Sequence, residues 1–180
     1  MDAAYASACV PDTRSVKQQP RPSSPALRKW PRHNPTLIKM KRTASAVWNG
    51  SLKEGSGTLS AQSGTLKSIP YSFGRRFGSD PGTNPEELIA AAHAGCYAMA
   101  LSAMLGEAGF TPERLDATAD VSLENVQPGG WTVTTSHLTL NAKIPGIDAA
   151  KFNEIANKAK AGCPISRLLT AKISLDAKLV

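Results

Sequence analysis

One long apolar segment constrains the fold of this 180-residue chain more than any other feature. Three residues interrupt the apolar run over residues 88–105: His93, Gly95 and Ser102. Asn84 is a favourable N-cap before this run, Pro85 suits the first helical position, and Gly109 suits the end. A helix that is apolar on every side is expected to be buried. Because its many alanines make it too weakly hydrophobic for a membrane span, the segment predicts a buried central helix.

Alternating apolar and polar residues predict β-strands on both sides of this helix. Before the helix, strands are expected in three short segments, at residues 44–48, 58–61 and 65–69. Asn49-Gly50 predicts a two-residue type I′ hairpin turn after the first of them. The segment 74–83, which leads into the helix, is expected to be a basic, glycine-rich loop.

A second set of strands is expected after the helix, at residues 117–124, 131–144 and 173–179. The parity of the apolar positions changes near Thr135, which predicts a bulge or a change of buried face there. A second helix is expected from Asp148 through Ala161, followed by a short turn at 164–169. Strands on both sides of a long apolar helix predict an α+β domain, with a mainly antiparallel sheet packed on that helix.

The basic charge of the chain is concentrated at its beginning. Residues 1–39 contain seven basic and two acidic residues together with six prolines, whereas residues 40–180 contain 14 basic and 12 acidic residues. We predict that 1–39 is a disordered basic, Pro-rich extension, or an artefact of an upstream start with Met40 as the working first residue. An organelle transit segment and a nucleic-acid arm are the alternatives. The functional domain is expected at 40–180, with neither a nucleic acid nor a membrane as its partner.

Three cysteines are too few for a disulfide-dense secreted scaffold. Their odd number and the lack of a secretory signal predict a reducing compartment, the cytoplasm. Cys9 falls in the extension and is expected to be incidental. His93 precedes Cys96 by three residues on one helix face, so it is either a core histidine bonded to its neighbours or a catalytic or metal-binding group.

Cys96 lies in the middle of an alanine-rich helix and Cys163 lies at a helix end and turn, and a cysteine in either setting is by itself more often a small hydrophobic residue than a nucleophile. Charged residues upstream of Cys96 favour a chemical role. Cys96 is too far into its helix to be activated by the helix dipole, so a thiolate there would need a nearby cation. Arginines and glutamates occur within about two dozen residues upstream: Arg75, Arg76, Glu86 and Glu87. Phe73, Phe77 and Met99 could form an apolar pocket beside the helix, with core packing as the alternative.

These cysteines lie in two distinctive segments: 82–96, GTNPEELIAAAHAGC, and 159–166, AKAGCPIS. The two segments resemble the OsmC/Ohr family of thiol peroxidases. The chain is most similar to the OsmC (osmotically inducible protein C) branch, and segments 105–112 and 119–123 fit that branch too. The resemblance covers roughly residues 40–180 and leaves out 1–39. It implies an OsmC-like fold in an intertwined homodimer.

The resemblance also implies a two-cysteine peroxidase that reduces organic hydroperoxides to alcohols. Cys96 matches the cysteine that attacks the peroxide and becomes a sulfenic acid, and Cys163 matches the one that resolves it as a disulfide. Arg76 matches the arginine that holds the peroxide and supports the thiolate, and Glu86 the carboxylate that orients this arginine. Their nearest alternatives are Arg75 and Glu87. The family implies no metal, haem or flavin, and a dithiol reductant, characteristically the lipoyl group of a lipoylated protein.

Two rival functions remain open from the sequence. A dimeric binding module with fortuitous cysteines is one, and nucleic-acid binding through 1–39 is the other. The loss of two thiols on addition of an organic hydroperoxide separates the enzyme from the binding module.

The spacing of Glu86 and Cys96 poses a geometric problem. Ten residues on one helix correspond to a rise of about 15 Å and to a rotation roughly 80° off a common line. One arginine therefore cannot comfortably reach both side chains. Either the helix breaks between Ala90 and Gly95, or two subunits share each site. The helix-forming residues on both sides of Gly95 favour the shared site.

Overall fold

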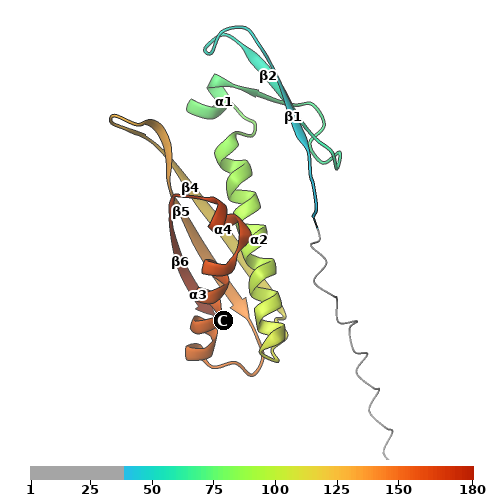
Figure 1. Ribbon diagram of the computed structural model, residues 1–180, viewed down its shortest axis with the longest axis vertical. Helices are drawn as coiled ribbons and strands as arrows, with labels where there is room; N and C mark the ends of the chain where they lie inside the picture. The colour runs from blue at the N-terminus through green and yellow to red at the C-terminus, as the bar shows by residue number, and fades with distance from the viewer. Residues whose placement is uncertain (1–38) are drawn as a thin grey trace, which may run out of the picture. The chain divides into compact units, whose positions relative to one another are not determined.

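The computed structural model of the protein describes residues 39–180 (Figure 1). The chain divides into two units, residues 1–41 and 42–180, and the second contains the helices and strands of the described residues. The predictions for the extension and for Cys9 lie outside the described residues, apart from Lys39 at the end of the extension.

The first three strands form one antiparallel sheet in the order β1-β2-β3. Their bounds are β1 Ala44–Asn49, β2 Ser56–Ala61 and β3 Ile69–Ser72. The predicted two-residue turn is wrong, because Asn49 pairs with Ser56 and a loop of residues 50–55 joins the strands. Within this loop the Gly55 amide donates to the Ser51 carbonyl at 2.9 Å, which closes a helix-like turn. The third strand also begins later than predicted, at Ile69.

Two helices follow, α1 (Phe73–Phe77) and α2 (Pro85–Glu107). The expected loop at 74–83 is partly wrong, since Ser72 caps α1 by accepting a hydrogen bond from the Arg75 amide at 3.3 Å. The start of α2 is as predicted: the Asn84 side chain accepts from the Glu87 amide at 2.8 Å. The helix is continuous through Gly95, so the alternative of a broken helix is excluded.

The C-terminal sheet has the order β4-β5-β6. Its strands are β4 Arg114–Val126, β5 Gly130–Lys143 and β6 Lys172–Leu179. β4 and β5 pair antiparallel, whereas β6 joins β5 in parallel. Ser122 pairs with Thr135 and Leu123 with Val133, so Thr134 is the additional residue of a bulge. The bulge predicted near Thr135 is confirmed.

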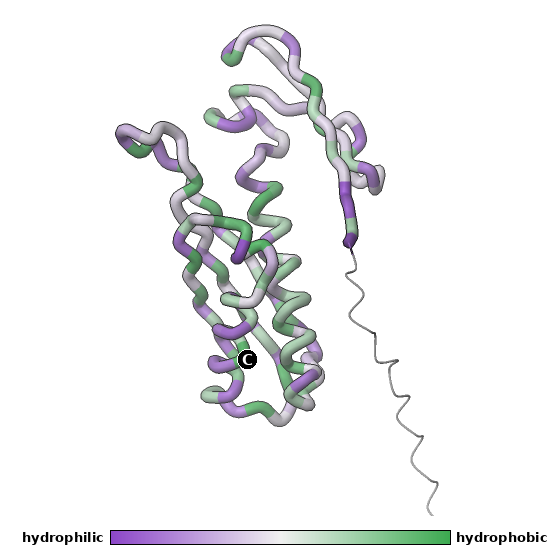
Figure 2. The backbone as a smooth tube through the Cα atoms, in the orientation of Figure 1, coloured by the Kyte–Doolittle hydropathy of each residue, from purple (hydrophilic) through white to green (hydrophobic). Residues whose placement is uncertain are grey.

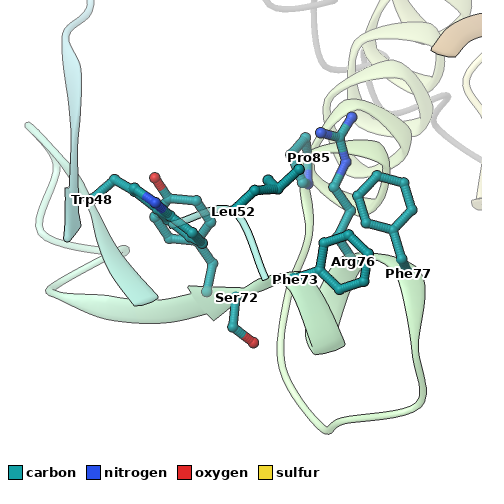
Figure 3. A pocket seen from close by; sticks show the side chains of 8 residues that line it. Trp48, Leu52, Ser72, Phe73, Arg76, Phe77 and Pro85 are labelled. Atoms are coloured by element: carbon teal, nitrogen blue, oxygen red, sulfur yellow. The ribbon is translucent and has the colours of Figure 1, made fainter. Parts of the chain in front are cut away.

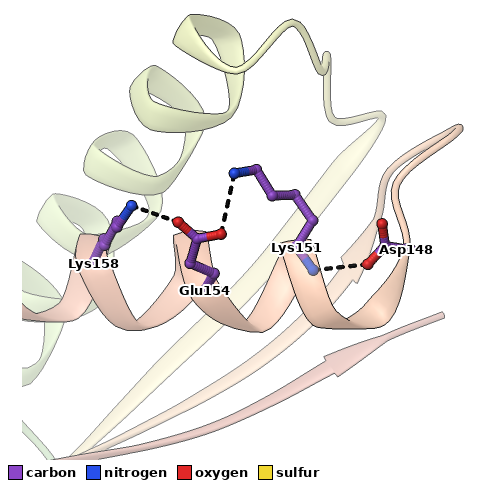
Figure 4. A network of polar contacts seen from close by, with 4 residues as sticks. All are labelled: Asp148, Lys151, Glu154 and Lys158. Atoms are coloured by element: carbon purple, nitrogen blue, oxygen red, sulfur yellow. Dashed lines mark hydrogen bonds and ion pairs between the residues drawn. The ribbon is translucent and has the colours of Figure 1, made fainter.

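Two helices connect β5 to β6, namely α3 (Ala149–Gly162) and α4 (Pro164–Leu168), and the turn predicted at 164–169 contains α4. Figure 4 shows the polar face of α3. Asp148 caps the helix by accepting from the Lys151 amide at 2.8 Å, and Glu154 pairs with both Lys151 and Lys158. Hydrogen bonds from Lys158 and then from Lys151 lower the pKa of Glu154. The opposite face of α3 is apolar and buried: Phe152, Ile155, Ala156 and Ala159.

The core lies between α2, α3 and the C-terminal sheet. α2 buries one face in the single chain, through His93, Tyr97, Leu101 and Leu105. Other α2 residues are exposed, and Met99 is 76% exposed, so the predicted burial on every side is not met within one chain. Figure 2 shows that α2 is predominantly apolar along its length. By length and composition α2 could cross a membrane, but core helices of soluble proteins pass the same test.

Candidate active site

Arg76 and Glu86 form a two-pronged ion pair where α1 approaches the start of α2. The terminal Nη2 of Arg76 lies 2.7 Å from Glu86 Oε1, and Nε lies 3.2 Å from Oε2. The Glu86 side chain is 13% exposed and that of Arg76 is 36% exposed. Such a bidentate pair fixes the plane of the guanidinium and leaves its remaining N–H groups for a ligand.

The neighbouring arginine has a different task. Arg75 donates from Nε to the Pro81 carbonyl at 2.8 Å, and its side chain lies against Gly82. Arg75 therefore holds the loop between α1 and α2. The structure brings Arg76, rather than Arg75, to Glu86.

Cys96 and Cys163 form a second cluster, at the contact between α2 and α4. Cys96 is half-buried on α2, and Cys163 is buried where α3 ends and α4 begins. Cys163 and the Ile165 backbone are the neighbours that influence the Cys96 thiol. The pKa of Cys96 is raised above its ordinary value, mainly by burial and also by Cys163, whereas the Ile165 backbone acts in the opposite direction and lowers it.

His93 is fully buried one helical turn before Cys96. Its Nδ1 lies 2.7 Å from the Ser136 hydroxyl of β5, and its Nε2 lies 2.7 Å from the Ser166 hydroxyl of α4. Burial lowers the pKa of His93, so the ring is neutral and donates one of these bonds while accepting the other. The interpretation as a bonded core histidine is confirmed. Ser136 was not among the residues predicted from the sequence to have a role. Its inward position in an alternating strand could have indicated a buried polar partner.

The two clusters do not meet within one chain. Glu86 and Cys96 stand on one continuous helix, ten residues and about 15 Å apart. Arg76 is not among the groups that shift the pKa of Cys96 within the described residues. The hollow of about 510 Å³ beside the Arg76–Glu86 pair is lined by α1, α2, β4 and Trp131, and neither Cys96 nor Cys163 contributes to it.

An apolar pocket of about 290 Å³ adjoins Arg76 (Figure 3). Its walls come from the first sheet, the 50–55 loop, α1 and the first residue of α2: Trp48, Leu52, Tyr71, Ser72, Phe73, Arg76, Phe77 and Pro85. Phe73 and Phe77 are half-buried and line this pocket, so they are not part of the main core. Met99, which was expected beside them, is exposed and does not line it.

Residues 39–180 contain no group of three or more histidine, cysteine or acidic side chains arranged to hold a metal ion.

Comparison with known proteins gives the family of this fold. Residues 78–178 match the family described as "OsmC-like protein". The chain belongs to this OsmC-like family. The matched segment includes Glu86, Cys96 and Cys163 and begins two residues after Arg76.

Two curated relatives of this OsmC-like protein have names that indicate a function. The chain is 54% identical over 142 residues to "Peroxiredoxin OsmC" of Escherichia coli (strain K12), covering 79% of this chain and 99% of the relative. It is 29% identical over 147 residues to "Organic hydroperoxide resistance protein" of Xanthomonas axonopodis pv. citri, covering 78% and 96%. These relatives support a peroxidase-type oxidoreductase with an antioxidant role.

Solved structures agree on the α+β fold with its long central helix. The organic hydroperoxide resistance protein OhrB of Bacillus subtilis superposes with a TM-score of 0.57 at 25% identity, covering 77% of this chain and 98% of that one. An OsmC-like protein of unknown function from Vibrio cholerae superposes with a TM-score of 0.64 at 16% identity, covering 77% and 99%.

Proposed function

We propose that this chain reduces organic hydroperoxides to alcohols through a cycle of Cys96 and Cys163 that uses no metal or bound cofactor. The observation that carries the proposal is the position of Cys163 and the Ile165 backbone beside the Cys96 thiol. An N–H donor stabilises a thiolate more than a thiol, so the Ile165 backbone partly offsets the burial and the Cys163 neighbour that raise the pKa of Cys96. The buried Cys163 would supply the second thiol of the disulfide.

In the first step the Cys96 thiolate attacks the terminal oxygen of the peroxide. A sulfur–oxygen bond forms, the oxygen–oxygen bond breaks, and the alkoxide takes up a proton and leaves as an alcohol. In the second step the Cys163 sulfur displaces the oxygen of the Cys96 sulfenic acid, which leaves as water, and a disulfide forms. A dithiol then supplies two electrons and two protons, which restore both thiols.

Arg76 and the apolar pocket suit the two ends of an organic hydroperoxide. The Arg76 guanidinium, oriented by Glu86, would bind the peroxide oxygens and stabilise the charge that develops on the leaving oxygen. The aromatic pocket beside Arg76 would accept an alkyl or fatty-acid chain, which hydrogen peroxide lacks. This arrangement favours organic hydroperoxides as substrates.

We infer that the active form is a homodimer with shared sites. The exposed apolar residues of α2 would be covered by a second copy packed across a two-fold axis. The Arg76–Glu86 pair of one chain would then face Cys96 and Cys163 of the other. The arginine would no longer have to span the rise of about 15 Å that separates Glu86 from Cys96 on one helix. We further propose that the reductant is a lipoyl group on a lipoylated protein and that the cycle runs in the cytoplasm.

Thiol counting with the parent and two cysteine variants tests this function. The reduced parent should lose two thiols on addition of one equivalent of cumene hydroperoxide, and dihydrolipoamide should restore them. Cys96→Ser should lose no thiol rapidly, because a serine hydroxyl is scarcely ionised near neutral pH. Cys163→Ser should react once and stall as a sulfenic acid or overoxidise.

Cys9 is the internal control, because its thiol should remain reduced throughout. A parent that keeps all its thiols in the presence of the peroxide would favour a binding module instead. Full turnover of Cys163→Ser with the dithiol would show that Cys163 is not the resolving cysteine.

A further inference from the structure

Two neighbours of the Cys96 thiol lie at the start of α4: Cys163 immediately precedes this helix and Ile165 lies within it. The helix has little stability of its own. It spans five residues, far fewer than the roughly 12–15 that an isolated helix needs. Cys163 stands at its N-cap and makes no side-chain capping hydrogen bond there. Contacts from outside α4 must therefore hold this turn against α2.

A buried histidine provides one such contact. His93 of α2 bonds the Ser166 hydroxyl of α4 at 2.7 Å, and its other nitrogen bonds the Ser136 hydroxyl of β5 at the same distance. Ser166 is 9% exposed and the other two residues are fully buried, so water does not compete effectively for these bonds. The imidazole thus joins α4 to the sheet.

The polar contact and the thiol contact have matching spacings. His93 and Cys96 are three residues apart on α2, and Cys163 and Ser166 are three residues apart at the start of α4. Residues with this spacing lie on one side of a helix. His93 pairs with Ser166 and Cys96 with Cys163, so the two contacts lie side by side between the same two helices. The histidine bond and the two cysteines therefore share one register between α2 and the start of α4.

We propose that His93 and Ser166 are positioning residues that hold α4 on α2, so that the Ile165 backbone and Cys163 stay beside the Cys96 sulfur. Ile165 immediately precedes Ser166, so both the amide donor and the resolving thiol move with this turn. The proposal deepens the two-cysteine function and rests on it. Neither His93 nor Ser166 touches the reacting atoms.

Apolar packing is the competing explanation for the position of α4. Ile165 packs against the core cluster and could hold the turn without any histidine. Ser166→Ala separates the two explanations, because it removes the hydroxyl and leaves Ile165 in place. The change is small, and a thermal unfolding curve checks that the variant is folded.

The C-terminal sheet offers a matched control for Ser166→Ala. Ser174 of β6 bonds His137 Nδ1 at 2.6 Å, and it belongs to neither α2 nor α4. Ser174→Ala therefore removes the same chemical group from another serine–histidine pair. Ser136→Ala loosens the far side of the His93 ring and should act in the same direction as Ser166→Ala, with a smaller effect.

The first measurement is the pH profile of Cys96 alkylation by iodoacetamide, followed by peptide mass. Looser seating of the Ile165 amide should move the profile of Ser166→Ala to higher pH. The alkylation rate at pH 7 should fall about three- to tenfold, since part of a charge-assisted hydrogen bond is lost. Ser174→Ala should keep the parental profile.

The second measurement follows the sulfenic acid after one equivalent of cumene hydroperoxide. Disulfide closure brings the sulfur atoms to about 2.05 Å and needs Cys163 in register. In Ser166→Ala a misplaced Cys163 should close the disulfide more slowly. Dimedone should therefore trap about three to ten times more Cys96 sulfenic acid in this variant than in the parent.

If folded Ser166→Ala has the same alkylation profile as the parent and the same yield of trapped sulfenic acid, the proposal is overturned in favour of apolar packing. Equal impairment of Ser174→Ala would also overturn it, because the effect would then be general. A parent that loses no thiol to the peroxide would defeat the proposed function instead, while the alkylation profile would still decide whether His93 and Ser166 position α4.

Discussion

At the residue scale, Arg76 and Arg75 show how one position along a short helix separates two tasks. The Arg76 guanidinium is bound by both oxygens of Glu86, and Arg75 donates to the Pro81 carbonyl. The first arrangement can orient a ligand, whereas the second holds a loop.

Arg76→Ala is expected to slow the reaction with organic hydroperoxide by roughly 100-fold, as for the loss of a donor that stabilises developing charge. Because Arg76→Ala leaves the mostly buried Glu86 carboxylate without its partner, it should lower the free energy of unfolding by about 1–2 kcal/mol. Stopped-flow thiol oxidation and denaturant unfolding measure the two effects. A slower reaction in Arg75→Ala than in Arg76→Ala would transfer the role to Arg75.

The buried His93 side chain should make the free energy of unfolding depend on pH. Burial lowers its pKa in the folded chain below the ordinary 6.5, so the unfolded chain binds this proton more readily than the folded one. The stabilising contribution is therefore complete above pH 6.5 and is lost as the pH falls through the folded pKa. Urea unfolding at pH 8, 7, 6 and 5 should show this loss on the acid side. A His93→Gln variant with the same acid-side loss would contradict the assignment.

At the element scale, the first sheet forms one wall of the apolar pocket because a glycine lies between two aromatic residues. Gly57 of β2 pairs with Trp48 of β1 and with Tyr71 of β3. The two rings meet beside it, with centroids 5.1 Å apart. A Cβ at Gly57 would lie 2.2 Å from the Val47 carbonyl oxygen and 2.5 Å from the Tyr71 ring.

Gly57→Ala should therefore destabilise the protein by about 1–3 kcal/mol through overpacking and should distort the pocket wall. Denaturant unfolding gives the stability, and the part of the tryptophan fluorescence that is lost in a Trp48→Phe background reports the pocket wall, because Trp30 and Trp131 also emit. Gly106→Ala in α2 is the control, because its added methyl meets open space and should stabilise the helix by about 0.5–1 kcal/mol. Equal stability of Gly57→Ala and the parent would contradict the contact argument.

At the scale of the whole molecule, the distance between the two clusters is the reason for proposing that a second chain contributes to each site. The Arg76–Glu86 pair and the thiol pair are each formed within one chain, at positions ten residues apart on one helix. Two-fold packing through the exposed face of α2 would produce two equivalent composite sites.

Mixed dimers test this arrangement directly. Glu86→Ala and Cys96→Ser should each be inactive alone, and a heterodimer of the two should contain one complete site. Random mixing should restore about a quarter of parental peroxidase activity, since half of the dimers are mixed and each has one of two sites. A fully active monomer, or verified heterodimers without activity, would show that the sites are not shared.

The amino-acid sequence is sufficient to predict the elements whose causes are local. The caps of α2, the alternating strands, the change of parity at Thr135 and the end of α3 can all be read from neighbouring residues. The two motif segments were sufficient to identify the family, and they contain Glu86, Cys96 and Cys163.

Contacts between residues that are distant along the chain become visible in the folded protein alone. His93 bonds Ser136 and Ser166, which are 43 and 73 residues away along the chain, and no local period encodes such a contact. The 50–55 loop, the short helices α1 and α4 and the single buried face of α2 likewise depend on packing that overrides short-range preference. Local sequence sets the period and ends of each element, whereas contacts between elements set the register in which the two thiols, and the arginine with its glutamate, come together.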